Sequence, residues 1–155
     1  MQRMHLHVSV ESLEKSIAFY SALFGVNPTV QKQDYAKWML DDPRVNFAIS
    51  QRGAQPGLDH VGIQVETDIE LNEIKARLDH AELATLTQEG TICCYAKSDK
   101  HWVQDPSGIA WEAYLTLDSA PTFNDTNLQT NGACCAPPVQ SVQFISKKSK
   151  GEQHG

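Results

Sequence analysis

The chain has 155 residues, which is enough for one domain with a hydrophobic core of its own. Its 13 Lys and Arg residues against 19 Asp and Glu residues give a net charge of −6, so its long-range field repels phosphate backbones. No run approaches the roughly 18 consecutive apolar residues of a membrane span, and the first residues contain no apolar signal-peptide core. We therefore expect a cytoplasmic protein whose partners include neither nucleic acid nor a membrane.

The first part of the chain predicts a strand followed by a helix. Residues 5–10 alternate apolar and polar side chains, as a half-buried strand does. Ser12 can cap the helix, and Gly25 can supply its left-handed end. The apolar stripe of this helix consists of Leu13, Ile17, Tyr20 and Phe24.

Two short β-prone segments, 35–40 and 45–50, follow this helix. The turn-forming sequence at 41–43 separates them, and a loop at 53–57 ends the unit. The unit is therefore predicted to be β-α-β-β, with room for one more short strand near Thr29.

The same pattern begins again 55 residues after its first occurrence, because His60–Val65 has the His-x-x-apolar-x-Val spacing of His5–Val10. A capping-box pattern at Thr67-Asp-Ile-Glu70 then predicts a second helix. The apolar positions of this helix are Ile69, Ile74 and Leu78, and Leu83 follows after it. The β-prone segments that follow are 91–96, 102–104 and 110–116, with a polar turn expected at 97–101.

The repeat predicts an α+β fold made of two βαβββ modules. We place the modules at about residues 3–52 and 58–117, inside one domain that covers residues 1–117. The remainder, 118–155, is rich in Asn, Thr, Ser, Pro and Gly and cannot bury enough apolar surface to order itself. We expect this segment to be a flexible tail.

Each module begins with a histidine at the same register of its first strand, so His5 and His60 can point into one cavity if the two strands pair. Glu112 is a carboxylate inside an apolar strand, a costly position unless a metal or a base compensates it. Two histidines and one carboxylate with vacant positions suit Fe(II), although Mn, Co, Ni or Zn can also enter. We therefore predict the metal ligands His5, His60 and Glu112. His7 has the strand parity of His5 and is its main competitor.

Four cysteines occur as two adjacent pairs, Cys93-Cys94 and Cys134-Cys135. They lack the spread spacing of a disulfide framework, so we expect free thiols. Neighbouring side chains of a regular strand point to opposite faces, so Cys93 and Cys94 can converge only at a bulge, a turn or a strand end. Gly90 nearby makes such a distortion plausible.

Three segments resemble the vicinal oxygen chelate superfamily, which includes glyoxalase I, extradiol dioxygenases and bleomycin-resistance proteins. They are His5-x-x-Val-x-Val-x-Ser-Leu-Glu-Lys-Ser-Ile-Ala-Phe-Tyr20, Leu58-Asp-His60-Val-Gly-Ile-Gln-Val65, and Asp105-Pro-Ser-Gly108 with Trp111-Glu112. The resemblance covers roughly residues 3–116. It implies paired βαβββ modules that form an open, cup-shaped mixed sheet around a metal, and it leaves the reaction open because this fold hosts many.

A more specific likeness lies in Gly90-Thr-Ile-Cys-Cys-Tyr-Ala-Lys-Ser-Asp-Lys100, followed by Trp102-Val and Trp111-Glu-Ala-Tyr114. These segments are similar to the branch of cadmium-inducible proteins and bacterial arsenic-carbon lyases. This resemblance implies an enzyme of arsenic resistance that uses Fe(II) and dioxygen to cleave a trivalent methyl- or aryl-arsenical to arsenite. It also implies that Cys93 and Cys94 bind the arsenic while His5, His60 and Glu112 hold the iron as catalytic ligands.

Several alternatives stay open at this stage. The chain could instead sequester cadmium or arsenic without turnover, or act as another three-ligand extradiol dioxygenase. Glyoxalase chemistry is a weaker alternative, because it needs a fourth ligand where this sequence has residues 47–49. Cys134 and Cys135 could pass arsenic to the other pair, sequester metal, or have no function. The modules could pair within one chain or between two, which leaves a monomer or a homodimer.

Overall fold

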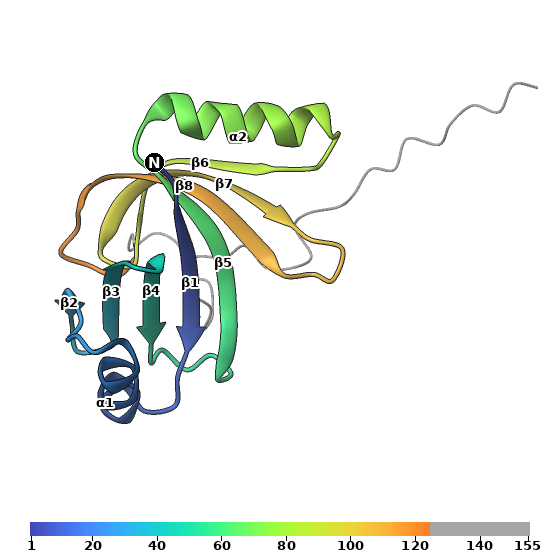
Figure 1. Ribbon diagram of the computed structural model, residues 1–155. Helices are drawn as coiled ribbons and strands as arrows, with labels where there is room; N and C mark the ends of the chain where they lie inside the picture. Colours follow the sequence, from blue (N-terminus) through green and yellow to red (C-terminus); the bar gives the residue numbers. More distant parts are fainter. Residues whose placement is uncertain (125–155) are drawn as a thin grey trace, which may run out of the picture.

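The computed structural model describes residues 1–124 as two modules of the same build (Figure 1). The first module contains β1 (Arg3–Ser9), α1 (Leu13–Phe24), β2 (Val30–Gln31), β3 (Tyr35–Asp41) and β4 (Arg44–Ser50). The second contains β5 (Gly57–Val65), α2 (Asp68–His80), β6 (Leu86–Cys93), β7 (Ala96–Gln104) and β8 (Ala110–Ser119). The predicted pair of βαβββ modules is confirmed.

The strands form a single curled sheet of eight strands in the order β2-β3-β4-β1-β5-β8-β7-β6. β1 pairs in parallel with β4, and β5 pairs in parallel with β8, whereas the other pairs are antiparallel. The modules meet where β1 runs antiparallel to β5. In this single chain the two modules therefore pair with each other.

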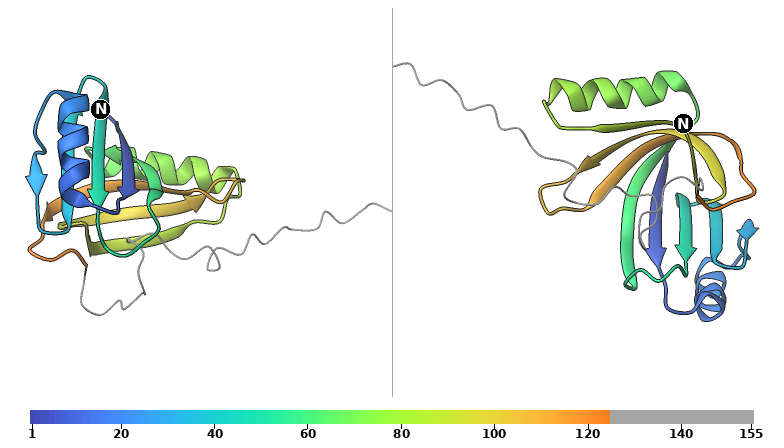
Figure 2. Two further views of the ribbon diagram at one scale, coloured as in Figure 1. Left: turned by 90° about the horizontal axis from the view of Figure 1, so that it is seen from below. Right: turned by 180° about the vertical axis from the view of Figure 1, so that it is seen from behind.

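Both helices pack on the outer face of the curled sheet (Figures 1 and 2). The core under α1 contains Leu13, Ile17, Tyr20 and Phe24 with Ala36, Trp38, Phe47 and Ile49. The core under α2 contains Leu71, Ile74 and Leu78 with Val65, Ala113 and Leu115. Because side chains alternate along a strand, residues such as His5, His60 and Glu112 point to the inner face.

The helix ends follow the sequence signals closely. The Ser12 hydroxyl accepts a hydrogen bond from the Lys15 amide, and Gly25 ends α1 with a left-handed φ of 71°. Thr67 caps α2 through the Glu70 amide. The expected stripe of α2 is wrong at Ile69, which is 72% exposed, because the buried side of the helix passes through Leu71 instead. None of the helices in residues 1–124 has the length and apolar character needed to cross a membrane.

Two parts of the second module differ from the prediction. The polar segment 97–101 is not a turn, because it lies inside the long strand β7. The chain reverses instead at Cys94 and Tyr95, where a two-residue turn connects the paired residues Cys93 and Ala96. Both turn residues have positive φ, 55° and 60°, as a tight hairpin of this kind requires.

The expected boundary at residue 117 falls inside β8, which continues to Ser119. Phe123 is also buried, and its ring packs against Tyr35 and Tyr95. The first residues of the expected tail therefore belong to the packed structure. Cys134 and Cys135 lie outside the described residues.

Candidate active site

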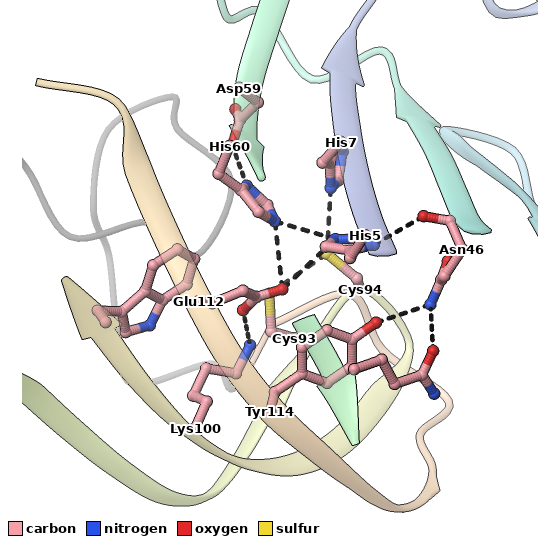
Figure 3. Close-up of polar contacts among 12 residues, drawn as sticks. His5, His7, Asn46, Asp59, His60, Cys93, Cys94, Lys100, Glu112 and Tyr114 are labelled. Carbon is pink, nitrogen blue, oxygen red and sulfur yellow. Dashed lines mark hydrogen bonds and ion pairs between the residues drawn. The ribbon is translucent and has the colours of Figure 1, made fainter. Parts of the chain in front are cut away.

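The three predicted ligands come from neighbouring strands and meet on the inner face of the sheet (Figure 3). His5 lies on β1, His60 on β5 and Glu112 on β8. Gly62 pairs with both His5 and Glu112 across these strands, so the absence of a side chain there leaves room for the Glu112 carboxylate. All three side chains are buried.

The donor atoms of these residues form a compact triangle. The Nε2 atoms of His5 and His60 are 3.2 Å apart, and each is 3.4 Å from Oε1 of Glu112. Donor atoms that bind one ion at about 2.1 Å, with angles between about 90° and 110°, lie roughly 3.0–3.4 Å apart. The triangle therefore has the dimensions of a metal site, and its nitrogen and oxygen donors suit a divalent transition metal.

Hydrogen bonds orient both imidazoles. Nδ1 of His5 lies 3.0 Å from the Asn46 carbonyl oxygen, which can only accept, so Nδ1 carries the proton. Nδ1 of His60 lies 2.6 Å from Oδ1 of Asp59, a second acceptor. Each ring therefore presents Nε2 to the centre of the site, which is the arrangement that supporting partners give to metal-binding histidines.

Lys100 fixes the other oxygen of Glu112. Its Nζ donates a 3.0 Å hydrogen bond to Oε2, which leaves Oε1 facing the two imidazoles. Both side chains are only 4% exposed. The ammonium also lies over the ring of Trp102 at 5.4 Å, so aromatic surface and a carboxylate together compensate a buried positive charge.

Burial and charge determine the protonation of the metal-free site. Burial lowers the pKa of His5 to about 3, because the nearby Glu112 carboxylate only partly offsets the loss of solvation. Burial also lowers the pKa of His60, but Glu112 and Asp59 outweigh it and raise this pKa to about 9. Burial raises the pKa of Glu112, yet Lys100 and His60 hold it well below its usual range. His5 is therefore neutral, His60 is protonated and Glu112 is ionised at neutral pH.

His7 completes a buried cluster of three histidines. One ring nitrogen of each of His5, His7 and His60 lies within 4.8 Å of the others, so this cluster also suggests a divalent metal site. The ring of His7, however, has neighbours at both nitrogens: Nε2 is 2.9 Å from Oγ of Ser50, and Nδ1 is 3.8 Å from Sγ of Cys94. The ring of His7 thus contacts Cys94 on one side, and its centre lies 4.9 Å from that of the His60 ring.

The hairpin turn brings the two cysteines together, which a regular strand would not do. Cys93 ends β6 and Cys94 is the first turn residue, and their Sγ atoms are 3.3 Å apart. Cys93 is disulfide-bonded, so the expectation of a free thiol is wrong at this position. Two sulfurs at this separation can bind one soft ion once both are reduced.

Contacts with the first module hold this turn over the inner face of the sheet. The Tyr95 hydroxyl donates a 2.5 Å hydrogen bond to Oδ1 of Asp34, and Asp34 also forms an ion pair with Arg52. The Arg52 guanidinium lies 3.9 Å from the centre of the Phe123 ring. The cysteines of one module are thereby tied to residues of the other.

Sequence reasoning did not identify several of these supporting residues. Lys100 was visible as a lysine two positions from Trp102, on the same strand face, but nothing in the sequence paired it with Glu112. Asp59 directly precedes His60 and could have been found by asking what orients that ring. Asn46 has no local signal, since its role depends on the parallel pairing of β1 with β4.

Comparisons with known proteins agree with this architecture. The model of the Glyoxalase/Bleomycin resistance protein/Dioxygenase superfamily matches residues 3–113. A trivalent organoarsenical cleaving enzyme of Bacillus sp. (strain MD1) is 39% identical over 94% of this chain and 98% of its own length. A trivalent organoarsenical cleaving enzyme of Thermomonospora curvata is 35% identical, over 88% of this chain and 90% of its own. The cadmium-induced protein CadI of Mycobacterium bovis is 36% identical, over 87% and 93% respectively.

Solved structures show the same fold at low sequence identity. An extradiol ring-cleaving dioxygenase from B. fuscum aligns with a TM-score of 0.57 and 17% identity, over 76% of this chain and 33% of that one. The Mn(II)-bound glyoxalase from Novosphingobium aromaticivorans aligns with a TM-score of 0.56 and 13% identity, over 81% and 43%. Together with the family match and the close relatives, these likenesses identify the fold of the chain. The chain belongs to the Glyoxalase/Bleomycin resistance protein/Dioxygenase superfamily.

Proposed function

We propose that this chain is a carbon–arsenic lyase that uses Fe(II) and dioxygen to cleave trivalent organoarsenicals to arsenite. The observation that carries the proposal is the placement of two sulfurs 3.3 Å apart beside a buried His-His-Glu triangle. A pair of thiolates selects soft, thiophilic arsenic, and the triangle suits a redox-active metal. Relatives that are 35–39% identical and are named trivalent organoarsenical cleaving enzymes support the same reading.

In this proposal His5, His60 and Glu112 hold the metal. Fe(II), when bound, supplies the one-electron chemistry that lets dioxygen react with a carbon–arsenic bond. Mn, Co, Ni or Zn can occupy the same donors without supplying that chemistry equally well. Lys100 keeps Glu112 ionised and presents a single oxygen of it, while Asn46 and Asp59 hold the two imidazoles in the tautomer that exposes Nε2.

Cys93 and Cys94 hold the substrate. Their thiols replace two hydroxyl groups of a methylarsonous or arylarsonous acid, which forms two As–S bonds and releases two waters. The turn then keeps the organic group next to the metal, so that the protein contributes proximity and exclusion of water. Because this step needs both sulfurs as thiols, we expect the enzyme to work in the reducing cytoplasm.

The overall reaction balances without a further reductant. Methylarsonous acid and dioxygen together give arsenous acid and formaldehyde, in which the methyl carbon loses four electrons and dioxygen gains them. Arsenic is trivalent in both the substrate and the product. The substrates required are therefore the arsenical and dioxygen alone.

The proposal is tested by measuring oxygen uptake, arsenite and formaldehyde from Fe(II)-loaded full-length protein and methylarsonous acid, with a thiol-free reductant present. Iron-dependent formation of all products, lost in Cys93→Ser and in Glu112→Gln, is the expected result. Glu73→Gln, at an exposed position of α2, is the matched control and should keep full activity. Arsenical binding without oxygen uptake in the iron-loaded wild type would refute the lyase.

Sequestration of a thiophilic ion without turnover is the second candidate function. The convergent sulfurs of Cys93 and Cys94 and the likeness to a cadmium-induced protein favour it. Such a protein would bind Cd(II) through the cysteines whether or not the histidine triangle is intact. Cd(II) binding that survives Glu112→Gln, in a protein without oxygen uptake, is its signature.

A further inference from the structure

A cavity of about 510 Å³ lies beside the cysteine turn. Its wall includes Cys94 and Tyr95 from the turn, Lys32 and Lys37 from the first module, and Thr116 from β8. The described residues that line it do not include His5, His60 or Glu112. The cavity therefore lies outside the triangle of proposed metal ligands, and Cys94 belongs both to its wall and to the proposed active site.

The strand pattern shows that this compartment continues the inner face of the sheet. On β3, Ala36 and Trp38 pack under α1, so Lys37 between them points to the opposite, inner face. On β8, Thr116 has the parity of Glu112, four residues earlier. A molecule held on Cys94 can therefore lie along one continuous surface, with one end near the metal triangle and the other beside Lys37.

The compartment carries an excess of positive charge. Two lysines line it against one carboxylate, that of Asp118, which accepts a hydrogen bond from the Ser119 amide at 2.7 Å. None of the salt bridges within residues 1–124 includes Lys32 or Lys37. Lys32 instead lies over the Tyr95 ring, with Nζ 5.4 Å from its centre.

Of the two lysines, Lys37 is the one that a bound anion would stabilise more. Burial lowers the pKa of Lys37, and the electrostatic effect of Cys94 acts in the opposite direction. A half-buried ammonium that lacks a carboxylate partner is costly, so an anion that enters the compartment gains more there than in water. Aromatic and apolar wall atoms from Tyr95, Val30 and Pro121 can contact a ring at the same time.

We propose that this compartment receives the far end of the organic group of an arsenical held on Cys94, and that Lys37 selects arylarsenicals whose ring carries a negatively charged substituent there. Carboxylate and ionised phenol groups are substituents of this class. The inference rests on the proposed function for the placement of arsenic on the cysteines. A methyl group would leave most of the cavity to water, whereas a substituted ring suits a volume within the range of about 300–1,000 Å³ that is typical of small-molecule pockets.

The test compares two probes of nearly the same size and shape, one with a charged substituent and one with an uncharged substituent. Full-length, metal-free protein with a thiol-free reductant is titrated calorimetrically with 4-carboxyphenylarsonous acid and with the uncharged 4-carbamoylphenylarsonous acid. A charge-assisted contact predicts that the wild type binds the carboxylate about ten- to a hundredfold more tightly than the carboxamide. The preference should fall to near one in Lys37→Met and persist in Lys37→Arg. Lys15→Met, an exposed lysine of α1, is the matched control and should keep the wild-type preference.

Equal affinities of the wild type for the two probes would overturn the inference, and this comparison needs no variant to fold. A preference that is undiminished in folded Lys37→Met would overturn it as well. The outcome is independent of turnover, because the probes are tested without iron. A charge preference in a protein that releases no arsenite would support the proposed role of Lys37 and refute the lyase. Turnover with equal affinities for the two probes would support the lyase and refute the role of Lys37.

Discussion

The Nζ atom of Lys100 lies 3.0 Å from Oε2 of Glu112, and this ion pair is buried between two neighbouring strands of the second module. A buried charge that loses its partner is costly. The pair therefore links the proposed metal ligand Glu112 to a lysine on the neighbouring strand β7.

Replacement of Lys100 by Met should weaken metal binding. Without the ammonium, burial raises the pKa of Glu112, and the carboxylate loses the contact that orients it. Loss of a supporting contact of this kind typically reduces metal affinity by about ten- to a hundredfold. Competition with a fluorescent chelator measures the affinity for Fe(II) or Mn(II). Lys97→Met, at an exposed position on the same strand, is the control and should bind the metal with wild-type affinity. Unchanged metal affinity in Lys100→Met would contradict the role given to the ion pair.

Gly62→Ala should disturb the site without changing any ligand. A Cβ atom at Gly62 would lie 2.4 Å from the Glu112 carbonyl oxygen and 2.7 Å from its Cγ, so β5 or the Glu112 side chain must move. Overpacking in a core typically costs about 1–3 kcal/mol. Thermal unfolding should show the lost stability, and chelator competition should show weaker metal binding. A Gly62→Ala variant with wild-type stability and wild-type metal affinity would mean that β8 can shift freely at this point.

Metal binding should release a proton at neutral pH. The carboxylates of Glu112 and Asp59 overcome the effect of burial and raise the pKa of His60 to about 9, so the metal must displace the proton on Nε2. Apparent metal affinity should therefore rise about tenfold per pH unit from pH 7 and level off near pH 9. Calorimetry in buffers of different ionisation enthalpy counts the protons released. Affinity that does not change between pH 7 and pH 9 would show that His60 is already neutral.

The same two histidines predict opposite effects of pH on the stability of the metal-free protein. Since the folded pKa of His60 is above its ordinary value of 6.5, its contribution is complete below that pH and is lost as the pH rises through about 9. Burial lowers the pKa of His5 to about 3, so its contribution is present above pH 6.5 and is lost as the pH falls toward 3. The free energy of unfolding, measured with a denaturant from pH 4 to pH 10, should therefore show the largest contribution of this pair near pH 6.5. His5→Asn should remove the loss of stability on the acid side, and His60→Asn should remove the loss on the alkaline side.

Tyr95→Phe should loosen the cysteine turn while leaving the fold intact. The variant loses the hydrogen bond from the Tyr95 hydroxyl to Asp34, which connects the turn to the first module. A single hydrogen bond to a charged group contributes about 1.5–3 kcal/mol, so the turn should open more often than the sheet unfolds. Hydrogen exchange of residues 91–96 should accelerate, and affinity for a trivalent arsenical should fall several-fold. Tyr20→Phe, on the side of α1 that packs on the sheet, provides the control. Slow exchange of the turn in Tyr95→Phe would show that Phe123 alone holds it.

The sequence predicted those features that depend on local patterns or on the repeat. Ser12, Gly25 and Thr67 mark the helix ends by their own chemistry, and the structure agrees at each of them. The convergence of His5 and His60 could be predicted because they lie in equivalent strands of the two repeats, β1 and β5, and these strands lie side by side when the modules pair.

The parts that could not be predicted depend on contacts between distant strands. The tight turn at Cys94 and Tyr95 contains neither Gly nor Asn, so the usual sequence signal for positive φ is missing. The inward position of Lys100 follows from the register of β7 against β8, which no local pattern specifies. Phe123 lies in a stretch of polar composition, and its burial depends on distant residues, including Tyr35, Ala48 and Tyr95.

The antiparallel contact between β1 and β5 is the one place in the sheet where the modules join, and the two imidazoles face each other across it. An ion that binds both rings can do so only while that contact is closed. Ion binding and module association are therefore linked by mass action, and each must strengthen the other by the same factor. A bound metal would then stabilise the contact between the two modules, and the modules would unfold together in a single cooperative transition.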